Sequence, residues 1–273
     1  MTRTAISPRL AIKIFDSTDD NVGGVDLPPH PQARPVEVPD DLAAAGWTVW
    51  TVDETGSTNA DLVAAAAVGA PHRTVLRTDH QTAGRGRLDR RWDAPAGTNL
   101  LVSILHREVP EPPVRLTHRT GLALVRAIRR TTGADARLKW PNDVLLADDD
   151  GETRKAAGML AQACPDGSVV VGCGINIGWA PEGAARIGDT ITPAALLEAV
   201  LAEFDLLGDD DTAEAAYRDH LDTIGRAVRV ETPGGTIEGR AVGVDDDGSL
   251  EVLDACAVTH RIGVGDVIHL RPT

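Results

Sequence analysis

The sequence is poor in cysteine and has no histidine motif or long apolar run. Its three cysteines, Cys164, Cys173 and Cys256, are widely spaced and odd in number, which argues against a disulfide framework and a zinc site. The eight histidines form no H-E-x-x-H or H-x-x-E-H pattern, so a zinc hydrolase is disfavoured. No apolar run approaches the roughly 20 residues of a membrane span, and the N-terminus lacks a signal-peptide core and cleavage site. These absences predict a soluble, cytoplasmic protein.

Aromatic residues make up only 3% of the chain, against 42% for hydrophobic residues as a whole. The core is therefore expected to consist of alanine, valine, leucine and isoleucine. With 273 residues, the chain is long enough for one large domain and one small domain. The formal net charge of −14 disfavours nonspecific nucleic-acid binding, which depends on basic surface. Any anion site must therefore be local.

Lysine is scarce although arginine is common. Of the 27 basic residues, only Lys13, Lys139 and Lys155 are lysines. An ammonium group is a compact charge, whereas a guanidinium group is a planar fork. Lysines retained in such an arginine-rich chain are therefore candidates for function, with chance as the alternative.

Composition divides the chain into three expected parts. Residues 1–43 are rich in proline and predict an extended, poorly ordered leader, with no room for an N-terminal helix-turn-helix domain. Residues 44–222 alternate strand and helix patterns, including a hairpin with its turn at 148–151, and predict an α+β domain built on a sheet. Residues 223–273 contain only short strand patterns between glycine-containing turns, which predict a small β-barrel.

Four arginines lie within seven residues of the segment DHQTAGRGRLDRRW, residues 79–92. Gly84 and Gly86 each weaken a helix by about 1 kcal/mol relative to alanine, so the segment is expected to start as a loop. Guanidinium forks match phosphate and carboxylate groups and stay charged at any working pH. The segment is a candidate anion site, with a solvated basic turn as the alternative.

Six segments together resemble the biotin protein ligase family, in the family's order and with family-like separations. The resemblance covers about Trp47 to Arg271. It implies an α+β catalytic domain with a mixed sheet, related to lipoate ligases, followed by a small SH3-like barrel. The segments are ETGSTNADL (54–62), HQTAGRGRLDRRW (80–92), GTNLLVSI (97–104), LKWPNDV (138–144), RKAAGMLAQ (154–162) and VGCGINIG (171–178).

The resemblance also implies an activity. Such ligases use ATP to activate biotin as biotinyl-5′-AMP and then transfer biotin to one lysine of a biotin carboxyl carrier domain of a carboxylase. The implied cofactor is Mg²⁺, and the implied enzyme is a monofunctional ligase that binds neither DNA nor membranes, as a monomer or homodimer.

Residue roles follow from the same resemblance. Lys155 is implied to clamp the mixed anhydride as a point charge, and Asp143 to orient or deprotonate the acceptor lysine. The implied catalytic residues are Lys155, Arg87, Arg85 and Asp143. The implied biotin contacts are Ser57, Thr58, Asn59, Gln81, Gly84, Arg85, Arg87, Lys155 and Gly158. The implied ATP and adenylate contacts are Arg87, Arg90, Trp92, Lys139, Asn142 and Asn176, with Asn176 also the candidate Mg²⁺ ligand.

Alternatives remain open for single motifs and for the whole chain. Ser57 or Thr58 caps a helix under any interpretation, and Asn142 after a proline is equally typical of a turn. A dinucleotide-binding fingerprint at 172–178 fails because no helix follows its glycines. The match weakens over 179–197, which lacks an Ala-Thr-Ser-Leu run common in relatives. The competing functions are a bifunctional ligase and repressor, a lipoate or octanoate ligase, and a noncatalytic biotin-binding module.

Overall fold

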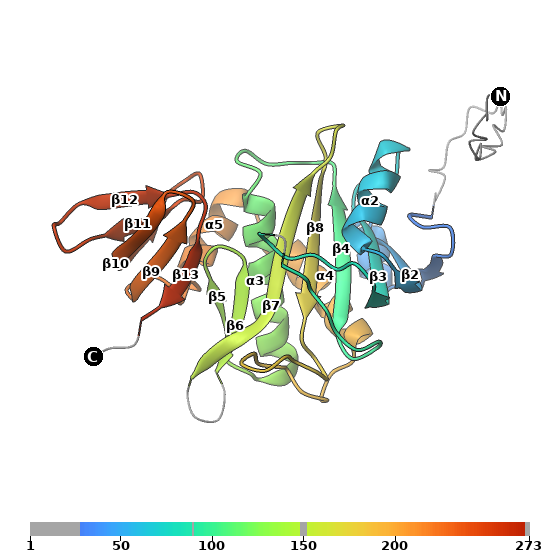
Figure 1. Ribbon diagram of the computed structural model, residues 1–273. Helices are drawn as coiled ribbons and strands as arrows, with labels where there is room; N and C mark the ends of the chain where they lie inside the picture. The colour runs from blue at the N-terminus through green and yellow to red at the C-terminus, as the bar shows by residue number, and fades with distance from the viewer. Residues whose placement is uncertain (1–27, 89, 148–151, 271–273) are drawn as a thin grey trace, which may run out of the picture.

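The computed structural model describes residues 28–88, 90–147 and 152–270, which form two sheets and five helices (Figure 1). The expected leader as far as residue 27, and the turn expected at 148–151, lie outside the described residues. Among the described residues, no helix is long and apolar enough to cross a membrane.

The larger sheet is mixed, which confirms the α+β expectation. Its eight strands follow the order β1-β2-β3-β4-β8-β7-β6-β5, with β2 and β3 parallel and the other neighbours antiparallel. The expected hairpin is present as β6 and β7, and a second turn at residues 140–142 joins β5 to β6. The strands are β1 (Arg34–Val36), β2 (Thr48–Thr55), β3 (Thr74–Gln81), β4 (Leu100–His106), β5 (Ala136–Lys139), β6 (Asp143–Ala147), β7 (Thr153–Ala163) and β8 (Val169–Ile175).

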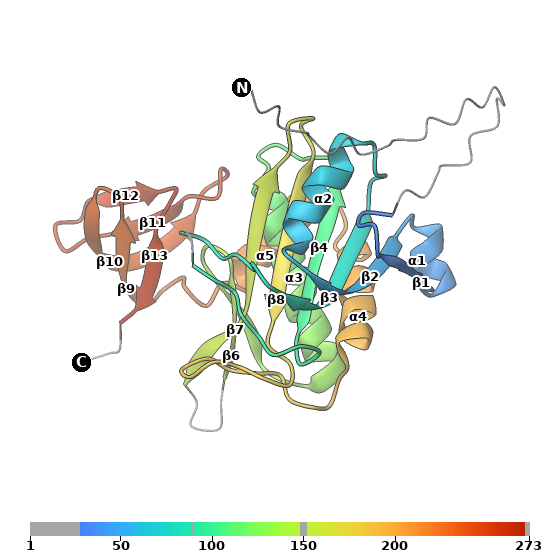
Figure 2. The ribbon, with the colours of Figure 1, turned by 45° about the vertical axis from the view of Figure 1, so that its right-hand side comes forward.

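Helices cover both faces of this sheet (Figures 1 and 2). Successive side chains of a strand point to opposite faces, so Leu105 of β4 packs with the α2 side while Ile104 packs with the α3 and α4 side. This alternation gives one core on each face of the sheet. The helices are α1 (Asp40–Ala44), α2 (Thr58–Ala67), α3 (Arg115–Thr132), α4 (Pro193–Asp205) and α5 (Asp210–Asp219).

Local sequence explains the ends of the longer helices. α3 ends at Gly133, and this residue adopts a φ of 73° that costs glycine no steric clash. α4 begins after Thr192, whose side chain accepts a hydrogen bond from the Ala195 N–H, and Pro193 occupies the first helical turn, where proline is favoured.

Residues 34–43 correct the expected leader, because they contribute β1 and most of α1. β1 pairs with the edge of β2, with Arg34 opposite Thr51, and Leu42 is only 3% exposed. Proline is compatible with an edge strand because one side of that strand needs no hydrogen-bond donor. The proline content led to a prediction of poor order, but Pro35 lies in a short edge strand.

The C-terminal part forms the expected small β domain, beside β5 and β6 in Figure 1. Five antiparallel strands follow the order β12-β11-β10-β9-β13. Buried Val228, Val230 and Val252 belong to its interior. The strands are β9 (Ala227–Thr232), β10 (Gly235–Val244), β11 (Leu250–Leu253), β12 (Thr259–Ile262) and β13 (Asp266–His269). Its architecture agrees with the SH3-like barrel that the family resemblance implies.

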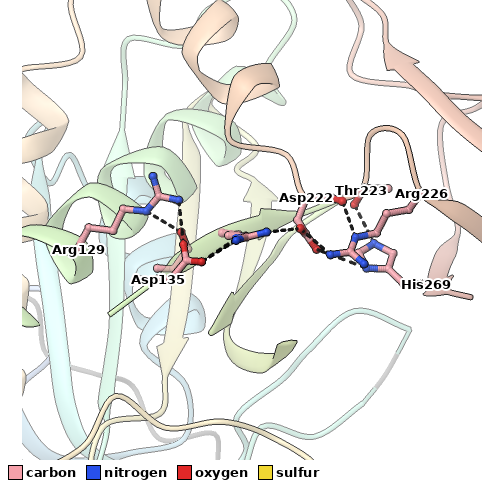
Figure 3. Close-up of polar contacts among 8 residues, drawn as sticks. Arg129, Asp135, Asp222, Thr223, Arg226 and His269 are labelled. Atoms are coloured by element: carbon pink, nitrogen blue, oxygen red, sulfur yellow. Dashed lines mark hydrogen bonds and ion pairs between the residues drawn. The ribbon is translucent and has the colours of Figure 1, made fainter. Parts of the chain in front are cut away.

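A polar junction connects the two sheets (Figure 3). Asp222, with a side chain 5% exposed, accepts hydrogen bonds from Arg137 at 3.1 Å and Arg226 at 2.8 Å. The neighbouring Thr223 hydroxyl accepts a hydrogen bond from the Trp140 N–H at 3.0 Å and contacts His269 of β13 at 3.2 Å. The junction therefore fixes the β5–β6 turn against the C-terminal domain.

Candidate functional site

A cavity of about 760 Å³ lies where both sheets meet the arginine segment. Its size is within the range of small-molecule sites. It is lined by the start of α2, the end of β3, the arginine segment, the β5–β6 turn, β7, β8 and β13. All the sequence-predicted site residues except Gly84 line it: Ser57, Thr58, Asn59, Gln81, Arg85, Arg87, Arg90, Trp92, Lys139, Asn142, Asp143, Lys155, Gly158 and Asn176.

Polar side chains at the start of α2 form one end of the cavity. Ser57 precedes the helix, but its side chain makes no capping hydrogen bond. Gln81 instead caps α2, because its Oε1 accepts the Thr58 N–H at 2.9 Å. The expectation that Ser57 or Thr58 caps the helix through its own side chain is therefore wrong, and the Ser57 hydroxyl is not used for capping.

Ser103 of β4 is a cavity residue that we did not single out from the sequence. Its Oγ lies 2.7 Å from Thr58 Oγ1 and 2.6 Å from Asn59 Oδ1, and it lines the cavity. β4 is buried along its whole length. A serine within this otherwise apolar strand pattern was the sequence feature that could have indicated a residue of the site. Buried polar groups are rarely left without partners.

The arginine segment folds as a tight hairpin. Arg85 and Arg91 form an isolated bridge, and the Trp92 N–H donates to Gly84 O at 3.0 Å. A Cβ atom added at Gly84 would lie 2.3 Å from the Trp92 carbonyl oxygen. The hairpin alone explains the need for glycine here, and the expected contact between Gly84 and biotin has no support because Gly84 does not line the cavity.

Two of the arginines contact the C-terminal domain. Arg87 donates to Asn142 Oδ1 at 3.2 Å and to the Gly265 carbonyl at 3.3 Å, and Arg90 forms an ion pair with Asp266. Burial lowers the pKa of Arg87 from its ordinary value, although an arginine remains charged throughout the working range. These contacts contradict a simple solvated turn.

Lys155 and Asp143 form an ion pair on the cavity wall, with 2.7 Å between Nζ and Oδ1. The Lys155 side chain is 41% exposed and that of Asp143 is 17% exposed. Burial lowers the pKa of nearby Lys139, an effect that Asp143 opposes and the charge of Lys155 reinforces. Asp266 also opposes this lowering of the Lys139 pKa. Lys139, Lys155 and Arg90 outnumber the two carboxylates, which leaves local positive charge for an anion.

Trp92 lies over paired glycines of β7 and β8. Gly158 is opposite Gly174 in the sheet, and a Cβ atom at Gly174 would lie 2.3 Å from the Trp92 ring. At Gly158 it would lie 3.0 Å from Lys155 Nζ and 3.2 Å from Trp92. The space beside Gly158 is therefore shared by Lys155 and Trp92, and because Gly158 lines the cavity, its contact with biotin stays a prediction.

Gly172 makes room for Asn59 in the same way. A Cβ atom there would lie 2.1 Å from Asn59 Oδ1, and Asn59 Nδ2 donates to the Leu160 carbonyl at 3.1 Å. Gly172 and Gly174 therefore accommodate two side chains that line the cavity, Asn59 and Trp92.

Asn142 combines the two roles that the sequence left open. Its Nδ2 donates to the Met159 carbonyl at 2.6 Å, and its own carbonyl accepts the Met159 N–H at 2.9 Å. These bonds hold the β5–β6 turn, as a structural role requires. Its Oδ1 also accepts from Arg87 at 3.2 Å, so the turn and the arginine hairpin are linked at the cavity.

Asn176 does not fit the expected Mg²⁺ contact. Its Nδ2 donates to the Ala185 carbonyl at 3.0 Å, and its Oδ1 accepts from Asn99 Nδ2 at 3.4 Å. Within residues 28–88, 90–147 and 152–270, no three His, Cys, Asp or Glu side chains are grouped to hold a metal. Mg²⁺ prefers carboxylate, phosphate and water oxygens. The visible role of Asn176 is to anchor the segment after β8.

Family models match both parts of the chain. Residues 67–178 match the biotin/lipoate A/B protein ligase family, and residues 223–270 match the biotin protein ligase C-terminal domain. The second match agrees with the SH3-like barrel expected there.

Individual relatives extend these matches along the chain. The biotin–[acetyl-CoA-carboxylase] ligase of Mycobacterium tuberculosis is 38% identical over 251 residues, covering 84% of this chain and 92% of that protein. The ligase of the same name from Paracoccus denitrificans is 35% identical over 232 residues, covering 72% and 90%. The solved biotin protein ligase of Aquifex aeolicus with biotin and ATP has a TM-score of 0.67 at 24% identity, covers 82% of this chain and 99% of that chain, and supports the fold. The chain therefore belongs to the biotin protein ligase family.

Proposed function

We propose that this protein is a biotin ligase that activates biotin with ATP as biotinyl-5′-AMP and transfers it to a lysine of a biotin carboxyl carrier domain. The main observation behind this proposal is that one cavity holds both charged and polar groups. Lys155, Asp143 and Arg87 supply the charges, and Thr58 and Gln81 form the polar end. The named relatives are ligases for acetyl-CoA carboxylase, which supports a biotin-dependent carboxylase as the partner.

The first half-reaction joins two anions, the biotin carboxylate and the α-phosphate of ATP. The carboxylate oxygen attacks phosphorus, and the bond to pyrophosphate breaks. Fixed cations lower the cost of bringing the anions together and stabilise charge in the transition state. Lys155 is proposed to bind the oxygens of the mixed anhydride, Arg85 and Arg87 to face carboxylate and phosphate, and Arg90 to contact the leaving polyphosphate.

The polar end of the cavity is proposed to bind the ureido ring of biotin. Ser57, Thr58, Asn59 and Gln81 supply hydroxyl and amide groups there. A buried polar ring requires matched donors and acceptors, since an unpaired group costs about 1–3 kcal/mol. Trp92 adds an apolar wall between this end and the cationic end.

The second half-reaction transfers biotin to the acceptor lysine. The neutral amine attacks the carbonyl carbon, the bond to AMP breaks, and the amine proton must be removed. Asp143 is proposed to accept that proton. Asp143 is paired with Lys155 here, and an adenylate that attracts Lys155 would weaken the pair and leave the carboxylate available as a base.

Several further properties belong to the same proposal. Lys139, Asn142 and Asn176 are proposed to border the adenylate, with Asn176 acting through the segment it anchors. Mg²⁺ is proposed to arrive with ATP on phosphate oxygens. We infer a cytoplasmic protein, acting as a monomer or homodimer on a carrier domain rather than on DNA.

Pyrophosphate release by the purified protein with Mg²⁺ and ATP tests the proposal, with biotin, lipoate or octanoate added in parallel. Release that depends on biotin supports it. The family model over 67–178 includes lipoate ligases, and release with lipoate or octanoate instead would assign the chain to them. Biotin binding without release would indicate a noncatalytic module.

A further inference from the structure

β13 places one carboxylate among the cations of the cavity. Asp266 is the first residue of this strand and lines the cavity, and its side chain is 22% exposed. It forms an ion pair with Arg90 of the arginine hairpin, which extends toward β13 in Figure 2. Arg90 is also the proposed contact for the leaving polyphosphate. In this structure a carboxylate therefore occupies a guanidinium group that is proposed to bind phosphate.

The charge of Asp266 acts on two more of the cations. It opposes the lowering of the Arg87 pKa that burial causes, and it has the same effect on the pKa of Lys139. A carboxylate favours the charged form of a basic group when the two lie close together. Asp266 therefore acts on three cations, Arg87, Arg90 and Lys139, that are all proposed to bind ATP or the adenylate.

The backbone at Asp266 is held in place, whereas the Arg90 side chain can change its partner. Asp266 is opposite Glu231 in the pairing of β13 with β9, and His269 at the other end of β13 contacts Thr223 of the polar junction at 3.2 Å. The Arg90 side chain is 66% exposed. An anion that enters the cavity can therefore attract Arg90 away from Asp266, but the carboxylate stays at the cavity wall.

A second carboxylate lies beside the first. Glu231, opposite Asp266, also lines the cavity. Directly opposed residues of an antiparallel pair have Cβ atoms about 4.5–5.5 Å apart, and like charges at such positions repel each other. Arg90 offsets this repulsion while it is paired with Asp266. When an anion takes Arg90, the repulsion returns and favours renewed pairing.

We propose that Asp266 competes with the pyrophosphate product for Arg90, and that this competition weakens the binding of pyrophosphate and speeds its release. The inference rests on the proposed biotin ligase function and concerns the step after biotinyl-5′-AMP has formed. An exposed ion pair is weak, so ATP can displace it on entry. Once the bond between the α- and β-phosphates has broken, pyrophosphate is held without the rest of the nucleotide, and Asp266 can pair with Arg90 again.

Replacing Asp266 with asparagine removes the competing charge and preserves the size of the side chain. The dissociation constant of magnesium pyrophosphate, measured by calorimetry without biotin, should fall by about threefold to tenfold. The KM for ATP in the biotin-dependent exchange of labelled pyrophosphate into ATP should also fall, and the dissociation constant of biotin should not change. Damage to the fold weakens binding, so a gain in affinity separates competition from a merely structural role.

Two further variants test whether the effect depends on Arg90. Glu238→Gln is the matched control, because Glu238 also pairs with an arginine of the C-terminal domain, Arg229 at 2.7 Å, but does not line the cavity. It should leave both constants unchanged. Arg90→Ala removes the group for which carboxylate and pyrophosphate compete. Adding Asp266→Asn to it should therefore change the pyrophosphate dissociation constant by less than about twofold.

The outcomes are distinguishable. An unchanged or raised pyrophosphate dissociation constant in folded Asp266→Asn protein overturns the competition, and so does an equal gain of affinity with and without Arg90. The proposed function fails separately, if wild-type protein releases no pyrophosphate from ATP when biotin is added. The calorimetric comparison would still decide the role of Asp266, because it requires no biotin. Unfolding temperatures of all variants confirm that the constants are measured on folded protein.

Discussion

Replacing Lys155 with glutamine should slow biotin activation strongly while leaving the fold intact. Glutamine retains a polar, unbranched side chain, one atom shorter than lysine, but removes the charge that lies 2.7 Å from Asp143 and 5.6 Å from the centre of the Trp92 ring. Because the ion pair is partly exposed to solvent, its loss should cost about 1 kcal/mol of stability or less. The unfolding temperature should therefore change little.

The effect on rate follows from the charge that develops on the phosphoryl oxygens. Two unit charges about 3 Å apart interact by about 5 kcal/mol at an effective dielectric constant of about 20. If roughly half of this attraction appears only in the transition state, its loss raises the barrier by about 2–3 kcal/mol. Pyrophosphate release at saturating biotin and ATP should then slow by about 30- to 150-fold.

Single-turnover pyrophosphate release measures this step without the carrier domain. Thr153→Ser is a suitable control on the same strand, since Thr153 does not line the cavity. A rate within threefold of wild type for the folded Lys155→Gln protein would refute the assigned role. If the variant instead raises the KM for ATP and leaves the rate at saturation unchanged, Lys155 stabilises the ground state and the transition state equally.

Three other predictions address the remaining cavity wall and the core. Arg90→Ala should raise the KM for ATP about tenfold, because a charge-assisted phosphate contact is lost, and an unchanged KM in steady-state assays would contradict this. Gly174→Ala should displace Trp92, since the added Cβ would lie 2.3 Å from the ring, and should lower both unfolding temperature and biotin activation. Gly263→Ala is the control, because an added Cβ there would come no closer than 3.6 Å to another atom. It should lower neither the unfolding temperature nor biotin activation. Burial lowers the pKa of His106 to about 3, so the unfolded chain takes up a proton below about pH 6.5 when the folded one does not. The contribution of His106 to the free energy of unfolding is complete above pH 6.5 and falls toward pH 3, by about 2 kcal/mol between pH 7 and 5. His106→Gln should remove this part of the pH dependence of the free energy of unfolding, measured by urea unfolding at each pH.

Sequence patterns predicted the parts of the site that depend on short segments. The arginine segment, the KWPND turn and the RKAAG strand each carried charged residues at positions that the fold brings to one cavity. Their order along the chain and their resemblance to the family were sufficient, because each segment forms a local element.

Long-range contacts were not predictable in the same way. Arg90 and Asp266 are separated by 176 positions, and no local pattern indicates which carboxylate meets which arginine. Nothing in the sequence indicated that Lys155 and Trp92 lie beside Gly158, because a glycine does not reveal what fills the space next to it. Pro35 was assigned to a disordered leader because proline content does not distinguish an edge strand from an extended coil.

The contacts of Arg87 and Arg90 with Gly265 and Asp266 also affect when a newly made chain can become active. Translation proceeds from the N-terminus, so the arginine hairpin is synthesised long before β13. While the chain is still on the ribosome, the hairpin lacks both partners, and the cavity lacks the wall formed by Asp266, Val267 and Ile268. A nascent chain therefore lacks a complete cavity until the C-terminal domain has folded against the arginine hairpin.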